Sequence, residues 1–199
     1  MIVFKDLNKS EPYIKFKDSY DVALSKGQKA IEAINISSFN PKSNEVSSRF
    51  VNLKYIINDE WIFFSNYRSS KADDFINHNQ ISGCFYWLKT NTQIRIKGEI
   101  FITDRLISDS HYQKRSLEKN ALSFCSRQSS KIPSYEEVRK NYESAINDAE
   151  KFSKRPDYWG GYSFRPYYFE FWKGHNSRLN KRDVYEKVEN EWNHYVLQP

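Results

Sequence analysis

The order of apolar and polar residues predicts a chain rich in strands, with a helix near its beginning. Apolar residues recur at helical spacing over 18–33, where Asp or Ser can cap the first turn, so at least the first half of this stretch is expected to be helical. Residues 30–39 then alternate between apolar and polar positions, which is typical of a strand with one buried face. Residues 47–66 predict a hairpin that turns at Asn58 and Asp59.

The rest of the chain predicts further strands with helices between them. A short helix is expected over 69–79, opened by Ser69 or Ser70, and helical stretches over 104–119 and 134–154, with a polar loop over 124–133. The predicted strands occupy 80–89 and 92–103, joined by a polar turn at 90–92, with two or three more over 160–174 and 176–199. This order favours a closed or nearly closed antiparallel barrel over a doubly wound sheet.

Composition places the chain among folded soluble proteins. It has 199 residues, enough for one domain, with 39% hydrophobic and 28% charged residues. No apolar run approaches the roughly 18 to 20 residues of a membrane span, and the N-terminus is too charged for a secretory signal, so a cytoplasmic location is expected. Cys84 and Cys125 have no CxxC spacing, which argues against a disulfide framework and a zinc site.

The net charge of +6 permits binding to nucleic acid, but the basic residues are scattered among acidic ones. A solvated basic surface and a site for an anionic small molecule therefore both remain open. The sequence lacks the common dinucleotide, nucleotide, hydrolase and zincin motifs, and its four histidines have no spacing that indicates a metal.

Cations and hydroxyls cluster at several predicted strand and helix ends. Arg49 and Lys54 bracket one strand, and their odd separation predicts that they point to opposite faces, where each could bind an anion or simply be exposed. Residues 65–71 place hydroxyls and a lysine at a helix N-terminus, which favours a phosphate, although simple capping explains them too. Residues 126–131 and 178–182 provide two further clusters of this kind.

The C-terminal segment carries a more specific pattern. Residues 155–174, RPDYWGGYSFRPYYFEFWKG, are followed by SRLNKRDVYEKVENEW at 177–192. This resembles the C-terminal signature of pyridoxamine 5′-phosphate oxidases, with a Trp-Gly-Gly turn, a Glu-Phe-Trp-x-Gly strand end and an Arg-Leu-x-x-Arg segment. The segments RFVNLK, FFSNYRSSKA, TQIRIKGEI and SRQSSKI lie upstream in matching order, so the resemblance covers about residues 30–199.

The resemblance implies a mainly β, α+β fold: an antiparallel split β-barrel of Greek-key type with peripheral helices, forming a homodimer with FMN at the interface. It implies oxidation of pyridoxamine or pyridoxine 5′-phosphate to pyridoxal 5′-phosphate with O₂ and release of H₂O₂, a step of vitamin B6 biosynthesis. Residues 1–199 would form one domain, with 1–17 as a short N-terminal arm. Family members fold a basic arm over the substrate, which Lys5, Lys9 and Tyr13 would imitate weakly.

Carried over by motif, the resemblance implies a nearly complete cofactor site. Arg49 and Lys71 would bind the FMN phosphate, with Ser70 where the family usually has an arginine, and Trp172 and Arg182 would close the flavin site. The cofactor-binding residues implied are Arg49, Phe50, Val51, Lys54, Phe64, Ser65, Ser70, Lys71, Gln93, Gln128, Ser129, Trp172 and Arg182.

The substrate site implied by the resemblance is less complete. Its residues are Lys54, His111, Tyr112, Arg115, Lys119, Arg178 and Asn180, and the catalytic ones are Arg178 and Asn180. The family has a tyrosine at His111, with Tyr112 adjacent, and a serine at Lys119. Its Arg-Leu-His-Asp-Arg is Arg-Leu-Asn-Lys-Arg at 178–182. A histidine can exchange a proton near neutral pH, whereas an asparagine only forms hydrogen bonds, a loss of about 1 to 3 kcal/mol.

Three other functions compete with this prediction. Asn180, Lys181 and Lys119 favour a related flavin oxidase of the same fold with another substrate, as in the relatives that act late in phenazine biosynthesis. A non-catalytic protein that binds FMN or pyridoxal phosphate would keep the cofactor residues without turnover. Nucleic-acid binding is less favoured, because the cations with implied roles belong to the ligand site, and neither nucleic acid nor a membrane is expected as a partner.

Overall fold

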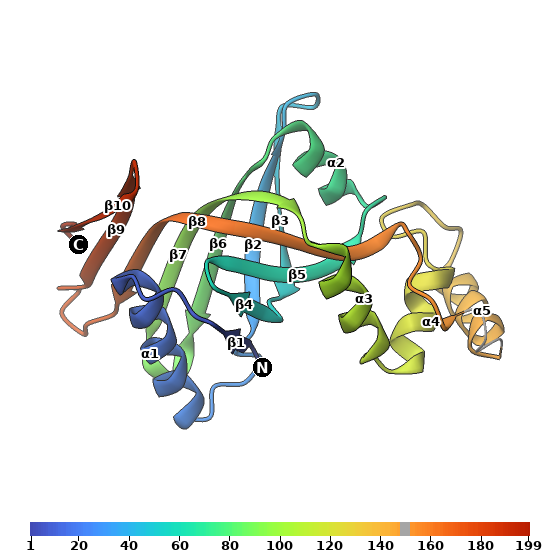
Figure 1. The fold of residues 1–199 in the computed structure, drawn as a ribbon, viewed down its shortest axis with the longest axis horizontal. Helices are drawn as coiled ribbons and strands as arrows, with labels where there is room; N and C mark the ends of the chain where they lie inside the picture. Colours follow the sequence, from blue (N-terminus) through green and yellow to red (C-terminus); the bar gives the residue numbers. More distant parts are fainter. Residues whose placement is uncertain (148–151) are drawn as a thin grey trace.

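A computed structural model of the protein describes residues 1–147 and 152–199, and these residues contain ten strands, five α-helices and the short 3₁₀ helix η1 (Figure 1). The helices are α1 (Glu11–Ser25), α2 (Ser70–Asn77), η1 (Leu88–Thr90), α3 (Arg105–Gln113), α4 (Leu117–Cys125) and α5 (Tyr135–Ile146). The strands are β1 (Val3–Lys5), β2 (Ala33–Asn40), β3 (Glu45–Asn52), β4 (Tyr55–Ile57), β5 (Glu60–Asn66), β6 (Gln80–Trp87), β7 (Thr92–Ile102), β8 (Trp159–Lys173), β9 (Lys181–Val188) and β10 (Glu191–Val196).

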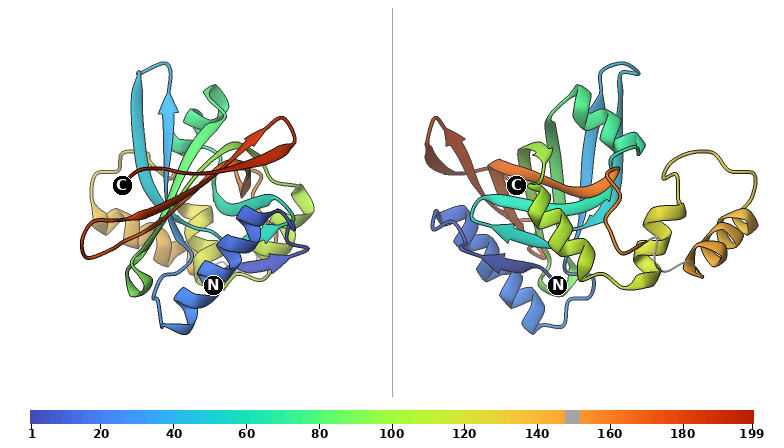
Figure 2. Two further views of the ribbon diagram at one scale, coloured as in Figure 1. Left: turned by 90° about the vertical axis from the view of Figure 1, so that its left-hand side faces the viewer. Right: turned by 45° about the vertical axis from the view of Figure 1, so that its right-hand side comes forward.

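All ten strands belong to one curled sheet. Its order is β1-β4-β5-β8-β7-β6-β2-β3, and β9 pairs with β8 and β10 with β9. Every pair is antiparallel except β1 with β4. The hairpin β9–β10 lies at one end of the molecule, and α4 and α5 lie at the other (Figures 1 and 2). The predicted α+β split barrel is therefore confirmed, with one parallel pair that the sequence pattern did not indicate.

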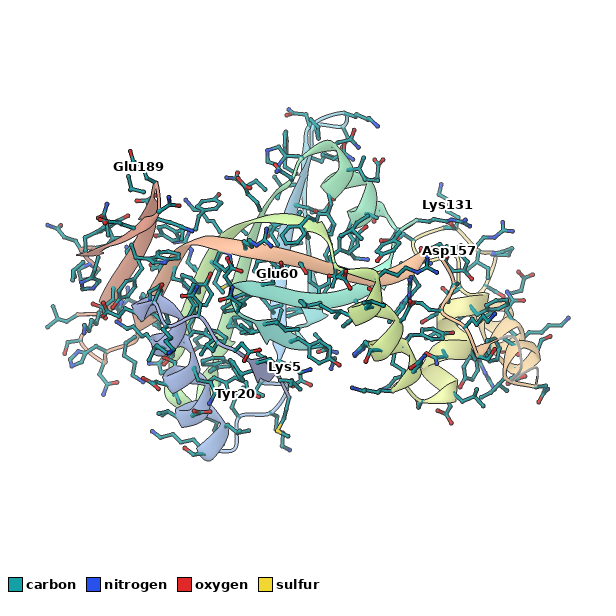
Figure 3. All side chains as sticks on the ribbon, viewed as in Figure 1. Lys5, Tyr20, Glu60, Lys131, Asp157 and Glu189 are labelled. Atoms are coloured by element: carbon teal, nitrogen blue, oxygen red, sulfur yellow. The ribbon has the colours of Figure 1, made fainter. Side chains whose placement is uncertain are left out.

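An aromatic core joins α1 to the inside of the sheet. The ring of Phe16 in α1 lies 4.4 Å from that of Trp61 in β5 and 5.5 Å from that of Phe85 in β6. These three side chains are completely buried, and burying each contributes roughly 1.5 to 3 kcal/mol. The hydroxyl of Tyr20, labelled in Figure 3, accepts a hydrogen bond from the backbone N–H of Ile2 at 3.1 Å.

The segment expected to be an N-terminal arm is packed against the barrel. Within 1–17, β1 extends the sheet and Ile2 and Tyr13 are buried. The ring of Tyr13 lies 5.3 Å from Phe169 and 6.1 Å from Trp192. The suggestion that Tyr13 could fold over a ligand is therefore wrong for this conformation, because its ring is part of the core.

Several predicted element boundaries differ from the structure. The first helix begins at Glu11, not Asp18, and ends at Ser25. The hairpin predicted over 47–66 is divided, because β3 pairs with β2 while β4 pairs with β5 around Asn58, whose φ is 51°.

Residues 104–119 form two helices instead of one helical stretch. Helix α3 ends at Gln113, and Ser116 occupies the N-cap position of α4 without a capping hydrogen bond from its side chain. Helix α4 continues to Cys125, into the predicted loop. The helix predicted over 134–154 ends at Ile146, and part of the prediction lies outside the described residues. In the parts of the chain that the structure describes, no helix has the length and apolar character needed to cross a membrane.

The long strand β8 determines how the candidate site is arranged. Trp159 begins it beside α3, and Trp172 lies near its other end, where β9 pairs with it (Figure 1). At about 3.3 Å per residue, these two tryptophans are on the order of 40 Å apart along the strand. Residues at the two ends of β8 therefore cannot meet within one copy of the chain.

Candidate functional site

A cleft of about 850 Å³ lies between strands β3 and β5, helices α3 and α4, and the loop that follows α4. Many of the predicted cofactor and substrate residues line it. These are Arg49, Phe50, Val51, Lys54, Phe64, Ser65, Ser70, Lys71, His111, Arg115, Lys119, Gln128 and Ser129. The fold thus brings together residues from four separate segments of the sequence, 49–54, 64–71, 111–119 and 128–129.

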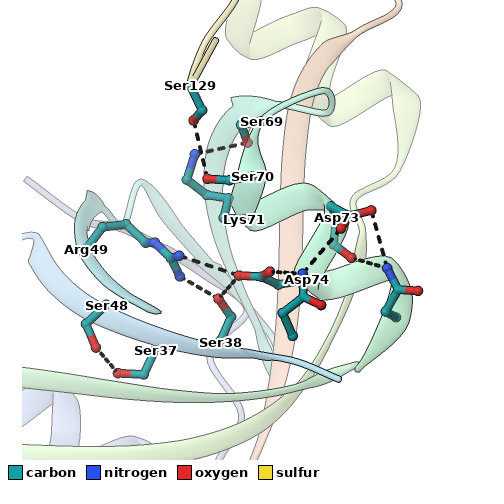
Figure 4. Close-up of polar contacts among 12 residues, drawn as sticks. Ser37, Ser38, Ser48, Arg49, Ser69, Ser70, Lys71, Asp73, Asp74 and Ser129 are labelled. Carbon is teal, nitrogen blue, oxygen red and sulfur yellow. Dashed lines mark hydrogen bonds and ion pairs between the residues drawn. The ribbon is translucent and has the colours of Figure 1, made fainter. Parts of the chain in front are cut away.

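Arg49 lies at one end of this cleft, beside helix α2. Its Nη1 donates a hydrogen bond to Ser38 Oγ at 2.6 Å, and its Nη2 is 3.5 Å from Asp74 Oδ2 (Figure 4). Burial lowers the pKa of Arg49, and the charge of Asp74 opposes that shift. An arginine remains protonated in spite of such a shift, so Arg49 presents a fixed positive charge.

Lys71 is the second cation at this end, in the first turn of α2. Its Nζ donates to Ser65 Oγ at 3.0 Å and to Ser69 Oγ at 3.1 Å, and the residue is only 6% exposed. Burial and the charge of Arg49 lower the pKa of Lys71 to about 8. Among the described residues, no carboxylate lies within ion-pair distance of this ammonium group. The charge of Asp74 compensates this ammonium only in part, so an anion bound here would stabilise it.

Hydroxyl and amide groups complete this end, which we call the first cation cluster: Arg49 and Lys71 with Ser65, Ser70, Gln128 and Ser129. The side chain of Ser70 donates to Ser129 Oγ at 3.4 Å (Figure 4), and Gln128 Oε1 accepts from the backbone N–H of Asn66 at 3.3 Å. The N-terminus of α2 adds its dipole. Fixed cations, hydroxyl donors and a helix N-terminus are groups that bind a phosphate.

A second cation cluster lies in the same cleft, formed by Lys54, Lys114, Arg115 and Lys119. Arg115 Nη1 donates to Ser123 Oγ at 2.9 Å, and its Nη2 donates to the carbonyl of Lys119 at 3.1 Å. The guanidinium lies 4.2 Å from the ring centre of Trp159, and burial lowers its pKa. Lys54 Nζ is 3.7 Å from Glu32, which balances only part of the positive charge.

Stacked rings form the wall beside the second cluster. His111 lies 3.7 Å from Phe64 with 7° between the ring planes, and Phe64 is in turn stacked on Trp159 at 5.5 Å. The hydroxyl of Tyr55 is 2.9 Å from His111 Nδ1. Burial and the neighbouring cations lower the pKa of His111 to about 4, so the imidazole is neutral at pH 7.

Two predictions about this cleft need correction. Tyr112, named beside His111 as a substrate residue, is buried against Trp159 and does not line the cleft. Arg49 and Lys54 were expected on opposite faces of one strand, yet both line the cleft. Strand β3 ends at Asn52, so the alternation does not extend to Lys54.

Sequence reasoning also missed residues that line the cleft or contact its walls. Trp159 was noted as part of the Trp-Gly-Gly turn but not as a site residue, and Tyr55, Lys114 and Ser123 were not singled out. The basic run at 114–115 directly after α3 is the one signal that could have indicated Lys114. The contact of Tyr55 with His111 spans distant segments, and no sequence pattern indicates it.

The remaining cofactor residues lie at the far end of β8. Gln93, Trp172 and Arg182 are neighbours across β7, β8 and β9, because Gln93 is paired with Trp172 and Trp172 with Arg182. None of them lines the cleft described above. The structure therefore divides the predicted site into two groups of residues within one chain.

A buried carboxylate, Glu170, holds Arg182 in place. Arg182 Nε donates to Glu170 Oε1 at 2.8 Å, Arg95 Nη1 donates to Oε2 at 2.9 Å, and the Tyr168 hydroxyl donates to Oε2 at 3.1 Å. Burial alone raises the pKa of Glu170, but the hydrogen bond from Arg182 and the charge of Arg95 bring it below its ordinary value. Glu170 is 1% exposed and was not identified from the sequence as a supporting residue.

The residues that depart from the family motif have local partners. Asn180 Oδ1 accepts from the backbone N–H of His175 at 3.0 Å, which holds the β8–β9 loop. Arg178 lies in this loop with φ 61°, and its side chain does not line the cleft. Lys181 Nζ is 3.1 Å from Asp183 Oδ2, which Lys15 also contacts at 2.7 Å. Arg178 and Asn180, predicted to be catalytic, are therefore also far from the cleft of the same chain.

Comparison with known proteins identifies relatives of this architecture. A family model described as the pyridoxine 5′-phosphate oxidase C-terminal dimerisation region matches residues 159–199. The pyridoxine/pyridoxamine 5′-phosphate oxidase of Cytophaga hutchinsonii is 33% identical over 165 residues, covering 81% of this chain and 75% of the relative. The enzyme of the same description from Coxiella burnetii is 30% identical over 96% of both chains.

Solved structures agree with this relationship. PhzG from Burkholderia lata 383, in complex with tetrahydrophenazine-1-carboxylic acid, superposes with a TM-score of 0.89 at 27% identity, covering 96% of this chain and 93% of PhzG. An FMN-binding protein from Nostoc punctiforme related to pyridoxamine 5′-phosphate oxidase has a TM-score of 0.79 at 16% identity, covering 96% and 100% of the two chains, which shows the shared fold. By its sequence relatives and its architecture, the chain belongs to the pyridoxine/pyridoxamine 5′-phosphate oxidase family of oxidoreductases.

Proposed function

We propose that this protein is an FMN-dependent oxidase that converts pyridoxamine or pyridoxine 5′-phosphate to pyridoxal 5′-phosphate, with O₂ as oxidant and H₂O₂ as product. The observation that carries the proposal is the presence of two separate cation clusters in one cleft. FMN and the substrate each have one phosphate, so each would have its own cluster. The descriptions of the sequence relatives named above support this choice of substrate.

The first cation cluster fits the FMN phosphate. Lys71 is a buried ammonium without a carboxylate partner among the described residues, and Arg49 reaches the same end of the cleft. Ser65, Ser70 and Ser129 offer hydroxyls beside them. When bound, FMN would supply the acceptor for the two electrons removed from the substrate.

The second cation cluster fits the substrate phosphate. Lys54, Arg115 and Lys119 would hold it, and the hydrogen bonds from Arg115 to Ser123 and to the Lys119 carbonyl keep its guanidinium in place. Fixing the phosphate in this way would restrict the position of the substrate, which reduces the entropic cost of reaction. The stacked wall of Phe64, His111 and Trp159 would exclude water from one side.

A second copy of the chain would complete the site. Gln93, Trp172, Arg178 and Arg182 lie at the end of β8 remote from the cleft, so they would act on the cleft of a partner. The match of residues 159–199 to a dimerisation region supports a homodimer. In this arrangement Trp172 and Arg182 would contact the flavin, and Arg178 would contact the substrate. A cytoplasmic location stays a prediction from the sequence.

A related flavin oxidase with another substrate is the second candidate. The TM-score of 0.89 with PhzG favours it, as do Lys119, Asn180 and Lys181, which depart from the family motif on the substrate side. Dependence on the substrate phosphate separates the two candidates. A vitamin B6 enzyme would lose most of its affinity for pyridoxamine that lacks the phosphate, whereas an enzyme for a substrate without phosphate would not turn over pyridoxamine 5′-phosphate.

The proposal is tested by flavin content, turnover and one substitution. Purified protein should contain FMN and release H₂O₂ from pyridoxamine 5′-phosphate. Lys54→Ala should raise KM for this substrate about ten- to a hundredfold, by loss of a charged hydrogen bond, while Lys26→Ala at the exposed end of α1 should not change it. Flavin-loaded protein that does not oxidise pyridoxamine 5′-phosphate would contradict the proposed activity.

A further inference from the structure

His111 is a neutral imidazole inside a group of cations. Its ring is stacked on Phe64, and the residues that face it include Lys54 before β4, Lys114 and Arg115 after α3, and Lys119 in α4. All four are basic, and no carboxylate among the described residues is paired with His111. Burial is the largest cause that disfavours the protonated form of His111, and the charges of these four residues add to it.

A bound dianion would reverse this balance. Two negative charges on the second cation cluster would offset the repulsion between these cations and a protonated His111. An opposite charge within about 4 to 6 Å raises the pKa of an imidazole by roughly 1 to 3 units. The site is therefore built so that the charge of His111 depends on whether an anion is present.

The contact with Tyr55 is compatible with both protonation states. The Tyr55 hydroxyl is 2.9 Å from Nδ1, and a hydroxyl can either donate a hydrogen bond or accept one. Burial raises the pKa of Tyr55, so the hydroxyl keeps its own proton. It can donate to Nδ1 of the neutral ring or accept from N–H of the imidazolium, and Nε2 has no hydrogen-bond partner within the described parts of the chain.

We propose that binding of a phosphate monoester at Lys54, Arg115 and Lys119 is coupled to protonation of His111, which then donates an additional charged hydrogen bond to the bound phosphate. This inference rests on the proposed function in one respect: it takes the second cation cluster as the site of the substrate phosphate. It assigns to His111 a role in the pH dependence of substrate affinity that a tyrosine at this position could not have.

The coupling has a defined sign. Without anion, the pKa of His111 is about 4, so the ring is neutral at pH 5 and above. With a dianion bound and the pKa raised by about 2 units, the complex takes up a proton below about pH 6. Anion affinity is then about tenfold higher at pH 5 than at pH 8, because the complex binds more protons than the free protein.

Sulfate is a suitable probe, because it stays doubly charged over this range and its own titration does not interfere. The chain has four histidines, so the imidazole C–H resonances of FMN-loaded protein can be followed by proton NMR between pH 5 and 8. The resonance absent from His111→Gln should be flat without sulfate and should titrate when sulfate is saturating. The dissociation constant of sulfate, taken from the same spectra, should rise about tenfold from pH 5 to pH 8 in the wild type.

Two variants make the test specific. His111→Gln keeps a polar partner for Tyr55 and cannot titrate, so its sulfate affinity should be nearly constant between pH 5 and 8. Lys54→Ala should weaken sulfate binding at every pH and leave the other three histidine resonances unchanged. A His111 resonance unaffected by sulfate, or a wild-type affinity that does not depend on pH, would overturn the inference.

The outcome for the proposed oxidase is measured separately. Flavin absorbance and turnover of pyridoxamine 5′-phosphate are recorded on the same samples. Loss of either contradicts the oxidase function, whereas the sulfate dependence of the His111 resonance alone decides the proton coupling.

Discussion

Buried charges without full compensation mark the residues most sensitive to a ligand. Lys71 is buried and Arg115 is half-buried, and neither has a carboxylate within ion-pair distance among the described residues. Glu170, in contrast, is buried with two arginines and a tyrosine as partners. A cation without a carboxylate partner favours the binding of an anion. A buried carboxylate with its own cations, such as Glu170, stabilises the residues around it.

Binding of FMN should weaken in alkaline solution because of Lys71. Its pKa in the ligand-free protein is about 8, so above that pH the ammonium must first regain a proton before it can bind phosphate. The dissociation constant of FMN should rise by up to about tenfold per pH unit above pH 8. Quenching of flavin fluorescence by the apoprotein between pH 7 and 9.5 measures this. Lys71→Arg, which stays protonated, should show a much flatter profile, and equal slopes for both proteins would contradict the assignment.

Glu170→Gln should destabilise the protein because it leaves Arg95 and Arg182 without their buried counter-ion. We expect the free energy of unfolding at pH 7 to fall by about 1 to 3 kcal/mol in urea titrations. The pKa of Glu170 is lowered in the folded state, so its contribution is present above its ordinary pKa and is lost as pH falls through the lowered value. The difference between wild type and variant should therefore shrink in acid.

A matched control for this substitution lies on the neighbouring strand β9. Glu186 accepts a hydrogen bond from the Tyr195 hydroxyl at 3.0 Å in an exposed position. Glu186→Gln should change the free energy of unfolding by less than about 0.5 kcal/mol. A cost as large as that of Glu170→Gln would show that burial of the carboxylate is not the cause.

At the scale of elements, strand β8 links the candidate site to the core. It pairs with β5, β7 and β9, and it can pass close to the end of β7 only because position 161 is a glycine. A Cβ on Gly161 would lie 2.7 Å from Thr103 Oγ1 and 3.2 Å from Phe64 Cε1. Thr103 is itself buried and hydrogen-bonded to the hydroxyl of Ser163, so its side chain cannot easily move.

Gly161→Ala should therefore affect both stability and the site. Overpacking of this kind costs about 1 to 3 kcal/mol of unfolding free energy, and displacement of Phe64 should also weaken binding in the cleft. Urea unfolding and FMN titration measure the two effects. Arg165→Ala, on the same strand with half-exposed ion pairs, should cost less than about 1 kcal/mol. A fully stable Gly161→Ala protein would show that β8 can shift.

The sequence predicted those helices and strands in which the periodicity of apolar residues is clear within the segment itself. The short helix opened by Ser69 and the strands near 80–89, 92–103 and 160–174 follow from their own periodicity. The start of α1 was missed even though Tyr13 and Phe16 continue its apolar stripe, because charged residues alternate with them. The division of the predicted hairpin was missed because the chain leaves β3 at Asn52 through Leu53 and Lys54, which include neither glycine nor proline.

The sequence predicted which residues belong to the candidate site but not how they are arranged in space. Motif order identified Arg49, Lys71 and Gln128, which the fold does bring into one cleft. It could not show that Trp172 and Arg182 lie far from that cleft, since motif order contains no distances between segments. The partners of Glu170 and of Asn180 depend on cross-strand register and loop geometry, which local patterns do not determine.

For the whole molecule, the division of the site between the two ends of β8 predicts that variants complement one another. Lys71→Ala and Arg182→Ala homodimers should each bind FMN poorly, because each has one altered residue in both of its sites. A heterodimer that combines them would have one intact site and one doubly altered site. Purified through two different affinity tags, it should bind about one FMN per dimer and recover up to half of the wild-type activity. No recovery would contradict a site shared between subunits.

In the proposed reaction, FMN bound in the cleft accepts two electrons from a phosphorylated B6 vitamer. The most direct test is the visible absorbance spectrum of the purified protein before and after addition of pyridoxamine 5′-phosphate without oxygen. We predict flavin bands that bleach on addition and return when air is admitted. Flavin bands that persist unchanged after the addition would contradict this proposal.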